Sequence, residues 1–336
     1  MWKVGAAALV GVGAALAAGC SSTGGDAVAD TIEAHVAAAR EAAGSEHAAL
    51  LERICTQATG IEVLGPPGSA RPTDSLPSAA AADRPGWYAD PVQVFDNLYF
   101  VGQTRYTAWA VTTSDGIIII DPLFDYSVQA EIEEGLTELG LDPADIRYVI
   151  VSHGHSDHAG GARHLQERFG ARVILAPEDW DLLERTGGDW PKPVRDIEAH
   201  DGYELRLGET TLVLYHTPGH TPGTISTIIP VRDGGASHVA ALWGGTAFNF
   251  MGRGEEDRWF RAYIASAERF AEIARAAGAD VMLSNHPQYD GSPTKIPALA
   301  ARAAGAPHPF VIGAESIARY MSVAAECARA GLLGVE

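Results

Sequence analysis

The chain has 336 residues, of which 46% are hydrophobic, and a formal net charge of −19 at pH 7. This length allows a large hydrophobic core, so we expect one globular domain with extensions. Such an acidic chain repels phosphate backbones and contains no basic stripe. Its charge therefore argues against nucleic acid as a partner. The expected partner is a small-molecule substrate.

The N-terminus has the pattern of an export signal. Residues 1–3 carry one positive charge, and residues 4–18 are an unbroken run of small and apolar residues. Because this run is shorter than the roughly 20 residues that span a bilayer, residues 1–19 are predicted to be a cleaved signal peptide. The run ends at Cys20 in a segment that resembles the cleavage box of bacterial lipoproteins. We expect a lipidated Cys20 that attaches the exported protein to a membrane, in the periplasm or on an outer face; ordinary cleavage after Ala17 is the alternative.

Residues 20–86 are predicted to be an N-terminal extension. Residues 30–57 have the pattern of two short amphipathic helices with a break at Gly44, and a linker rich in Pro, Gly and Ala follows. After Cys20, the chain contains only two further cysteines, Cys55 and Cys327. In an oxidising compartment they could form a disulfide between the extension and a C-terminal helix; two separate buried thiols are the alternative.

A catalytic domain with a C-terminal helix is predicted over residues 87–336, with strands and helices that alternate along the chain. Before the central motif, strands are expected at residues 92–95, 98–101, 107–113, 117–120 and 146–151, and a helix at 126–139. After it, helices are expected at residues 161–169, 177–185, 258–277 and 314–330, and strands at 171–176, 203–207, 211–215, 224–230, 239–243 and 280–284.

A cluster of histidines follows the strand predicted at residues 146–151. His153, His155, Asp157 and His158 lie within six residues. His153 and His155 are two positions apart, so on an extended segment their side chains point the same way, and the other two follow where the chain turns. Imidazoles and a carboxylate gathered at a strand end are ligands that suit zinc.

The pattern His-x-His-x-Asp-His after a strand resembles the signature of the metallo-β-lactamase fold superfamily. The resemblance covers residues 92–293 and is strongest to the histidine-rich third subclass of zinc metallo-β-lactamases. It implies an α/β fold, a four-layer αβ/βα sandwich, with one or two zinc ions at the rim of the paired sheets. It also implies that Asp121, which ends a strand, lies beneath the metal site and orients ligands through hydrogen bonds.

The resemblance extends to a second histidine segment, His-Thr-Pro-Gly-His-Thr-Pro-Gly at residues 216–223. It implies that His220 completes the first zinc site with His153 and His155. The proline and glycine neighbours of His220 favour a tight loop that can present one imidazole. His216 ends a predicted strand and is expected to be structural.

The resemblance also implies the ligands of a second zinc. Residues 243–248 lack the metal-bridging Asp of the glyoxalase II-like thioesterases and the zinc-binding Cys of another β-lactamase subclass; a glycine or Thr246 stands there. The histidine-rich subclass also lacks a bridging ligand, and holds its second zinc with the motif Asp, the last motif His and a late His. The matching residues are Asp157, His158 and His286.

The expected cofactor is therefore a pair of zinc ions, and the resemblance implies that a zinc-bound hydroxide attacks an amide or ester carbonyl. Asp157 is the predicted catalytic residue, since it can also orient the hydroxide. Export, six matching ligands and the missing bridging Asp favour a β-lactam substrate. Lactones, thioesters or other esters are the alternative, and a non-catalytic metal-binding lipoprotein is a remote third. Thr246 could meet a substrate carboxylate, and Tyr289 could either bind substrate or be a packed aromatic.

Overall fold

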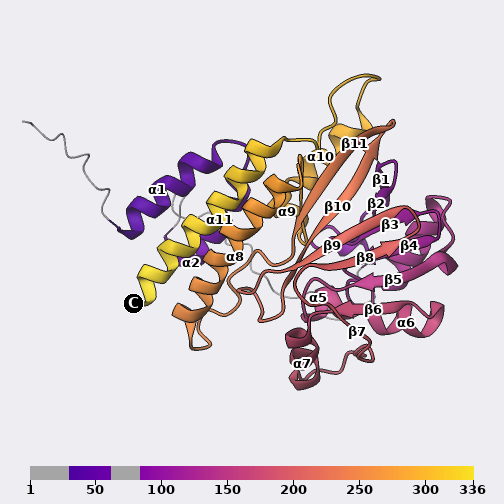
Figure 1. Ribbon diagram of the computed structural model, residues 1–336, viewed down its shortest axis with the longest axis horizontal. Helices are drawn as coiled ribbons and strands as arrows, with labels where there is room; N and C mark the ends of the chain where they lie inside the picture. The colour runs from indigo at the N-terminus through magenta and orange to yellow at the C-terminus, as the bar shows by residue number, and fades with distance from the viewer. Residues whose placement is uncertain (1–29, 62–83) are drawn as a thin grey trace, which may run out of the picture.

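The computed structural model describes residues 30–61 and 84–336 (Figure 1). The predictions of a signal peptide over residues 1–19 and of lipidation at Cys20 lie outside the described residues, as does most of the predicted linker. Among the described residues, no helix has the length and apolar character needed to cross a bilayer.

Two sheets form the centre of the molecule. The strands of the first, in spatial order, are β1 (Val92–Phe95), β2 (Leu98–Phe100), β3 (Trp109–Thr113), β4 (Gly116–Ile120), β5 (Ile146–Ile150), β6 (Arg172–Leu175) and β7 (Ile197–Glu198). The strands of the second are β12 (Val281–Ser284), β11 (Ala236–Trp243), β10 (Ile225–Asp233), β9 (Thr210–His216) and β8 (Tyr203–Leu207). The first sheet is antiparallel up to β4 and parallel from there, and β11 and β12 form the parallel pair of the second.

Helices cover the outer face of each sheet. On the first sheet lie α4 (Glu134–Glu138), α5 (Ser156–Ala159), α6 (Ala162–Phe169) and α7 (Pro177–Arg185). On the second lie α1 (Ile32–Ala43), α2 (Ala48–Thr59), α8 (Glu256–Ala276) and α11 (Ala314–Val335). The short helix α3 (Arg84–Trp87) precedes β1, and α9 (Pro287–Asp290) and α10 (Ser292–Ala300) follow β12.

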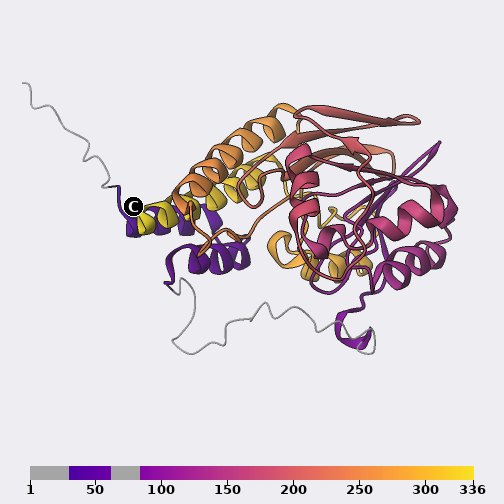
Figure 2. The same cartoon turned by 90° about the horizontal axis from the view of Figure 1, so that it is seen from below.

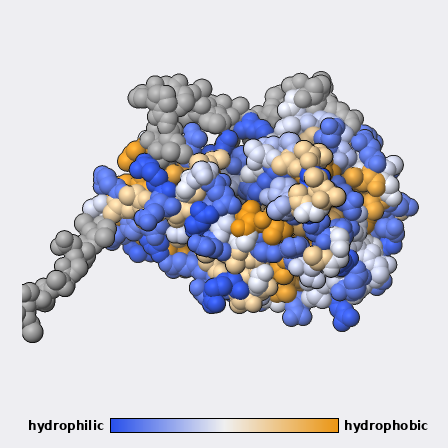
Figure 3. Space-filling view, turned by 90° about the horizontal axis from the view of Figure 1, so that it is seen from above, coloured by the Kyte–Doolittle hydropathy of each residue, from blue (hydrophilic) through white to orange (hydrophobic). Residues whose placement is uncertain are grey.

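Three apolar clusters lie between four layers. One joins the first sheet to its helices and includes Val149 and Leu165. The middle cluster joins the two sheets and includes Trp109 and Ile229, and the third joins the second sheet to the outer helices and includes Phe270. Burial of this apolar area is the main force that holds the layers together. The predicted α/β four-layer sandwich is confirmed. In agreement with this burial, the face in Figure 3 is mostly hydrophilic, with hydrophobic residues in small groups.

The predicted helix at residues 126–139 is only partly right. The structure has a π-helical segment, Gln129–Glu133, that continues into α4. At the junction, the buried Glu133 accepts a hydrogen bond from Arg168 Nε at 2.8 Å and contacts His164, both on α6. These partners are distant in sequence, so the local pattern gave no sign of them.

The N-terminal extension forms two helices, α1 and α2, which separate at Gly44 as predicted; this glycine has a φ of 51°, a value that side-chain-bearing residues rarely adopt. Both helices pack against α11, and Figures 1 and 2 show α1 running beside it. The extension therefore belongs to the outer helical layer of the sandwich.

A disulfide fixes this arrangement. Cys55 on α2 and Cys327 on α11 are bonded, with their Cα atoms 4.7 Å apart and a separation of 272 positions in sequence. The sequence left open a disulfide or two separate buried thiols, and the structure has the disulfide. The bond joins the extension to the last helix of the chain.

We expect reduction of the Cys55–Cys327 bond to lower the free energy of unfolding by several kcal/mol. A cross-link over so long a loop restricts the unfolded chain, and the chain-entropy estimate is on the order of 5 kcal/mol. Urea denaturation with and without reductant measures the loss. The Cys55→Ser/Cys327→Ser protein is the control, since reductant should leave its stability unchanged; equal stability of oxidised and reduced wild type would contradict the prediction.

The contact between His35 on α1 and Glu326 on α11 is expected to depend on pH. Its Nδ1 lies 2.5 Å from Glu326 Oε2 and its Nε2 lies 2.7 Å from Asp30 Oδ1. Partial burial lowers the pKa of His35, but hydrogen bonds to Glu326 and Asp30 outweigh it, and the pKa is raised above 6.5. The unfolded chain lacks these partners, so their stabilisation is full below pH 6.5 and is lost as pH rises through the folded-state pKa.

We therefore expect His35→Gln to destabilise the protein by about 1–2 kcal/mol at pH 6 and by progressively less at higher pH. Urea denaturation between pH 5.5 and 9 tests this. The exposed His200 in the loop before β8 supplies the control, because His200→Gln should leave the curve of stability against pH unchanged. A His35→Gln effect that is the same at every pH would contradict the ionic role of this side chain.

Candidate metal centre

The histidine motif lies at the carboxyl end of β5. After β5 the chain makes a buried turn that contains His153, and α5 begins directly after His155. Asp157 and His158 are therefore on the first turn of a helix, while the two earlier histidines precede it. This change from strand to helix directs all four side chains to one space, as predicted.

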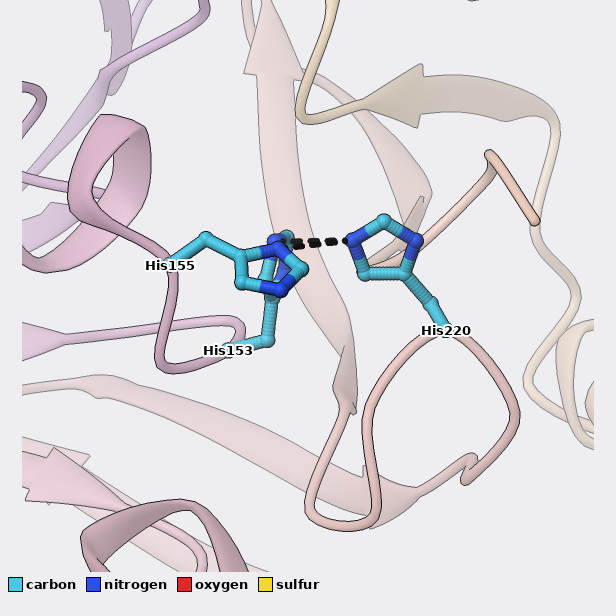
Figure 4. A group of neighbouring side chains, drawn as sticks. All are labelled: His153, His155 and His220. Carbon is cyan, nitrogen blue, oxygen red and sulfur yellow. Dashed lines mark hydrogen bonds between the residues drawn. The ribbon is translucent and has the colours of Figure 1, made fainter. Parts of the chain in front are cut away.

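His153, His155 and His220 converge in this space (Figure 4). His220 Nε2 lies 3.0 Å from His153 Nε2 and 3.2 Å from His155 Nδ1. A tetrahedral zinc with Zn–N bonds of 2.0–2.1 Å would separate its ligand atoms by roughly 3.3 Å. The spacing of the three nitrogens therefore fits a single ion.

Hydrogen bonds on the far side of two rings fix which nitrogen faces the centre. His153 Nδ1 donates to Gly244 O at 2.9 Å, and His220 Nδ1 donates to Ala247 O at 2.5 Å. Carbonyl oxygens only accept, so both Nδ1 atoms carry the proton and both Nε2 atoms present lone pairs. Two lone pairs 3.0 Å apart repel each other unless a cation lies between them. The donor set of this buried site fits a metal ion.

A second group of ligands adjoins the first. His158 Nε2 lies 3.1 Å from Asp157 Oδ2 and 3.3 Å from His286 Nε2, and His286 Nε2 lies 3.7 Å from Asp157 Oδ2. His286 Nδ1 donates a hydrogen bond to Arg105 O at 3.1 Å, so Nδ1 carries the proton and the Nε2 lone pair can bind a metal. The structure thus brings together all six residues predicted as ligands, in the two sets predicted.

The electrostatics of the site keep most of its imidazoles neutral. Burial lowers the pKa of His153 and His220 well below 6.5, and burial beside His158 lowers the pKa of His286 to about 3. For His158, burial lowers the pKa, but Asp157 and Asp121 outweigh it and raise the value to about 10. The carboxylates thus favour a positive charge at the second group of ligands, and a bound cation would replace the proton there.

Asp121 lies beneath this second group. It accepts hydrogen bonds from Ser152 N at 2.7 Å and Ser152 Oγ at 2.8 Å, and its Oδ2 lies 2.9 Å from His158 Nδ1. Its backbone has a φ of 61°, a conformation that is costly for a residue with a side chain. These contacts are the geometry that the predicted orienting role requires.

The two predicted substrate-contact residues have other partners. Thr246 is buried, and its hydroxyl lies 3.2 Å from that of Ser284. Tyr289 is almost buried in the apolar cluster of the outer helices, with its ring edge-on to His286 at 5.7 Å. The structure gives both a packing role, and substrate contact remains a prediction for each.

Some partners of the ligands were missed in the sequence. Asn285 Nδ2 donates to Gly244 O at 2.8 Å, the same carbonyl that accepts from His153. In α2, Gln57 Oε1 accepts from Phe248 N at 2.8 Å, next to the carbonyl that holds His220. The position of Asn285, at a strand end beside His286, could have identified it from the sequence as a partner of the site. The backbone carbonyls of Gly244 and Ala247 could not have been identified in this way.

The site is thus a candidate metal centre, built from histidines and an aspartate, on a fold of two packed sheets. Residues 101–233 match the family model described as "Metallo-beta-lactamase superfamily". The crystal structure of a subclass B3 metallo-beta-lactamase of Bradyrhizobium japonicum superposes with a TM-score of 0.62 and 27% identity, over 72% of this chain and 94% of that one. Residues 101–233 are therefore similar in sequence to the metallo-β-lactamase superfamily, a superfamily of hydrolases, and the fold is similar to that of a subclass B3 enzyme.

Curated relatives have varied names. An N-acyl homoserine lactonase of Azorhizobium caulinodans is 27% identical over 47% of this chain and 65% of its own length. A hydroxyacylglutathione hydrolase of Acidiphilium cryptum is 26% identical over 62% of this chain and 79% of its own length. The chain spans only about half the length of other curated relatives, such as an uncharacterized protein of Aquifex aeolicus, at 50%.

Proposed function

We propose that this chain is an exported, zinc-dependent hydrolase that opens β-lactam rings. The observation that carries the proposal is the ligand set: two adjoining groups, His153, His155 and His220 beside Asp157, His158 and His286, with no acidic residue in the segment 243–248. Likeness to a subclass B3 metallo-β-lactamase over 94% of its length supports the substrate class.

The backbone around Gly245, where other family members have a metal-bridging acid, is consistent with this ligand set. A Cβ atom on Gly245 would lie 2.5 Å from His220 Cβ, so a side chain there would displace a ligand. The next side chain, Thr246, turns toward Ser284. A bridging acid at this position would need a different path of the backbone. We therefore propose that the two ions are held without a bridging acid.

The residues of the site divide the chemistry between them. Bound zinc supplies a lowered water pKa, from about 15.7 to about 7. His153, His155 and His220 would hold one ion, and Asp157, His158 and His286 would hold the other. The Asp157 side chain is 17% exposed and is ionised, because His158 and its neighbours hold its pKa far below the usual range despite burial. It would accept a hydrogen bond from the attacking water and orient it toward the substrate carbonyl.

The proposal of export and membrane attachment rests on the sequence of residues 1–20 alone. Their charge, apolar run and cysteine have the pattern of a lipoprotein leader. A β-lactamase acts where it meets the antibiotic, outside the cytoplasm, so the two parts of the proposal agree. Fractionation of cells that express the full chain tests it: membrane attachment should depend on Cys20, and Cys20→Ala should release the protein from the membrane.

A lactone is the second candidate substrate. It is favoured by the similarity to an N-acyl homoserine lactonase, although that similarity covers less than half of the chain. A lactone and a β-lactam both present a ring carbonyl to the same attack, so the ligand geometry permits either.

The deciding experiment measures hydrolysis by the purified mature chain, with zinc content determined in parallel. A chromogenic cephalosporin and an N-acyl homoserine lactone are tested separately. Cephalosporin turnover that chelator abolishes and zinc restores would support the proposal. Two zinc ions with turnover of the lactone alone would replace the β-lactam by the second candidate, and zinc binding without turnover of any ester or amide would leave a non-catalytic metal-binding protein.

A further inference from the structure

A buried carboxylate joins the two loops that supply the three-histidine set. Asp179 on α7 is fully buried. Its Oδ2 accepts hydrogen bonds from Gly154 N and Thr221 Oγ1, each at 2.7 Å, and its Oδ1 accepts one from Gly223 N at 2.7 Å. Gly154 lies between His153 and His155, whereas the other two donors follow His220. One side chain therefore contacts the backbone on both sides of the set.

Gly154 and Gly223 allow the two loops to lie close to Asp179 on α7. A Cβ atom on Gly223 would lie 2.7 Å from Asp179 N, closer than real Cβ contacts occur. A Cβ on Gly154 would lie 3.2 Å from Asp179 O and would press on the same helix. The second glycine of the His-Thr-Pro-Gly repeat thus serves this contact and not only the turn.

The segment after His220 also has a direct backbone tie to the motif, because Ile225 N donates a hydrogen bond to Ser152 O at 2.8 Å. Within its own loop, Thr221 contacts Thr224, their hydroxyls 2.8 Å apart. The Asp179 carboxylate adds a side-chain link between the loops, and its three donors make short, charge-assisted hydrogen bonds. Burying a carboxylate costs several kcal/mol unless such donors satisfy it, so their geometry is tightly set.

We propose that Asp179 is a positioning residue: it sets the separation between His155 and His220, and through it the affinity of the three-histidine set for metal. Asp179 touches neither the ligands nor the reacting atoms. The inference rests on the proposed metal-binding function. The separation of the ligand nitrogens would then depend on a side chain of α7, a helix that contributes no ligand.

The test compares Asp179→Asn with Asp181→Asn, a matched change on the same helix at an exposed carboxylate that pairs with Arg195. An asparagine keeps the shape but replaces one acceptor oxygen by a donor amide, which must oppose a hydrogen-bond donor. The measurements are zinc affinity by competition with a chromophoric chelator, the visible spectrum of the cobalt-substituted protein, and the stability of the metal-free protein.

We expect Asp179→Asn to weaken zinc binding at one of the two ions by about 10–100-fold and to shift the cobalt bands, with no change in Asp181→Asn. Loss of stability with unchanged zinc affinity and an unchanged cobalt spectrum would overturn the proposal, because it would show a purely structural role. If Asp179→Asn does not fold, Thr221→Val removes one of the three hydrogen bonds and is measured in the same way. A wild-type protein that binds no zinc would overturn the proposed function and this inference together, whereas normal zinc binding by the variants overturns this inference alone.

Discussion

Replacing His220 by alanine is expected to lower turnover by about a thousandfold or more. A metal ion contributes several kcal/mol to the stabilisation of charge in the transition state, and each 1.36 kcal/mol corresponds to a tenfold change in rate. His220 shares one set with His153 and His155, so its loss leaves two ligands where three are needed. Steady-state kinetics and zinc content should fall together, with about one zinc per chain remaining.

His216 provides the matched control. It lies four positions earlier, at the end of β9, and its Nε2 is 3.4 Å from Glu178 Oε2, away from the ligand set. We expect His216→Ala to retain zinc and most of its turnover. Equal activity of His220→Ala and wild type would exclude the three-histidine set from catalysis.

Replacing Asp157 by asparagine is expected to lower turnover by about 10²–10⁴-fold, the range typical of a lost acid–base group. The change keeps the shape of the side chain but removes the charge that lies 3.1 Å from His158 Nε2. Since the carboxylate also belongs to the second ligand group, zinc binding at that group should weaken. The kinetics are therefore measured at saturating zinc, so that the loss of orientation is separated from the loss of metal.

Asp125→Asn is a suitable control, because Asp125 is an exposed carboxylate close in sequence to the site but outside both ligand groups. Its turnover should match that of wild type. If Asp157→Asn has full activity at saturating zinc, Asp157 does not orient the attacking water, and the mechanism proposed above fails.

The sequence located the candidate ligands because their signals are local. Four of them follow one strand within six residues, and His220 and His286 each lie in a short loop with a proline within two positions. A strand end fixes direction, so spacing alone predicted that the four motif side chains share one space, whereas His220 and His286 were predicted from the resemblance. The amphipathic periodicity likewise located α1, α2, α8 and α11 with errors of only a few residues, except that α11 runs on to Val335.

What holds the ligands in place is not local, and the sequence did not reveal it. Asp179 lies 25 positions from Gly154 and 44 from Gly223, and nothing in its helix distinguishes it from the exposed Asp181. Backbone carbonyls such as that of Ala247 carry no sequence signal at all. For the packing of the extension onto α11, the sequence offered only the possible pairing of Cys55 with Cys327, because periodicity identifies an apolar face but not its partner.

The bond between α2 and α11 changes what a protease can do to this protein. A single cut of the backbone anywhere between residues 55 and 327 would produce two polypeptides but still one covalent molecule, because each fragment keeps one cysteine of the pair. The N-terminal residues, Cys20 among them, would stay joined to the metal-binding domain after such a cut. The two fragments would separate in a denaturing gel only when the sample is reduced.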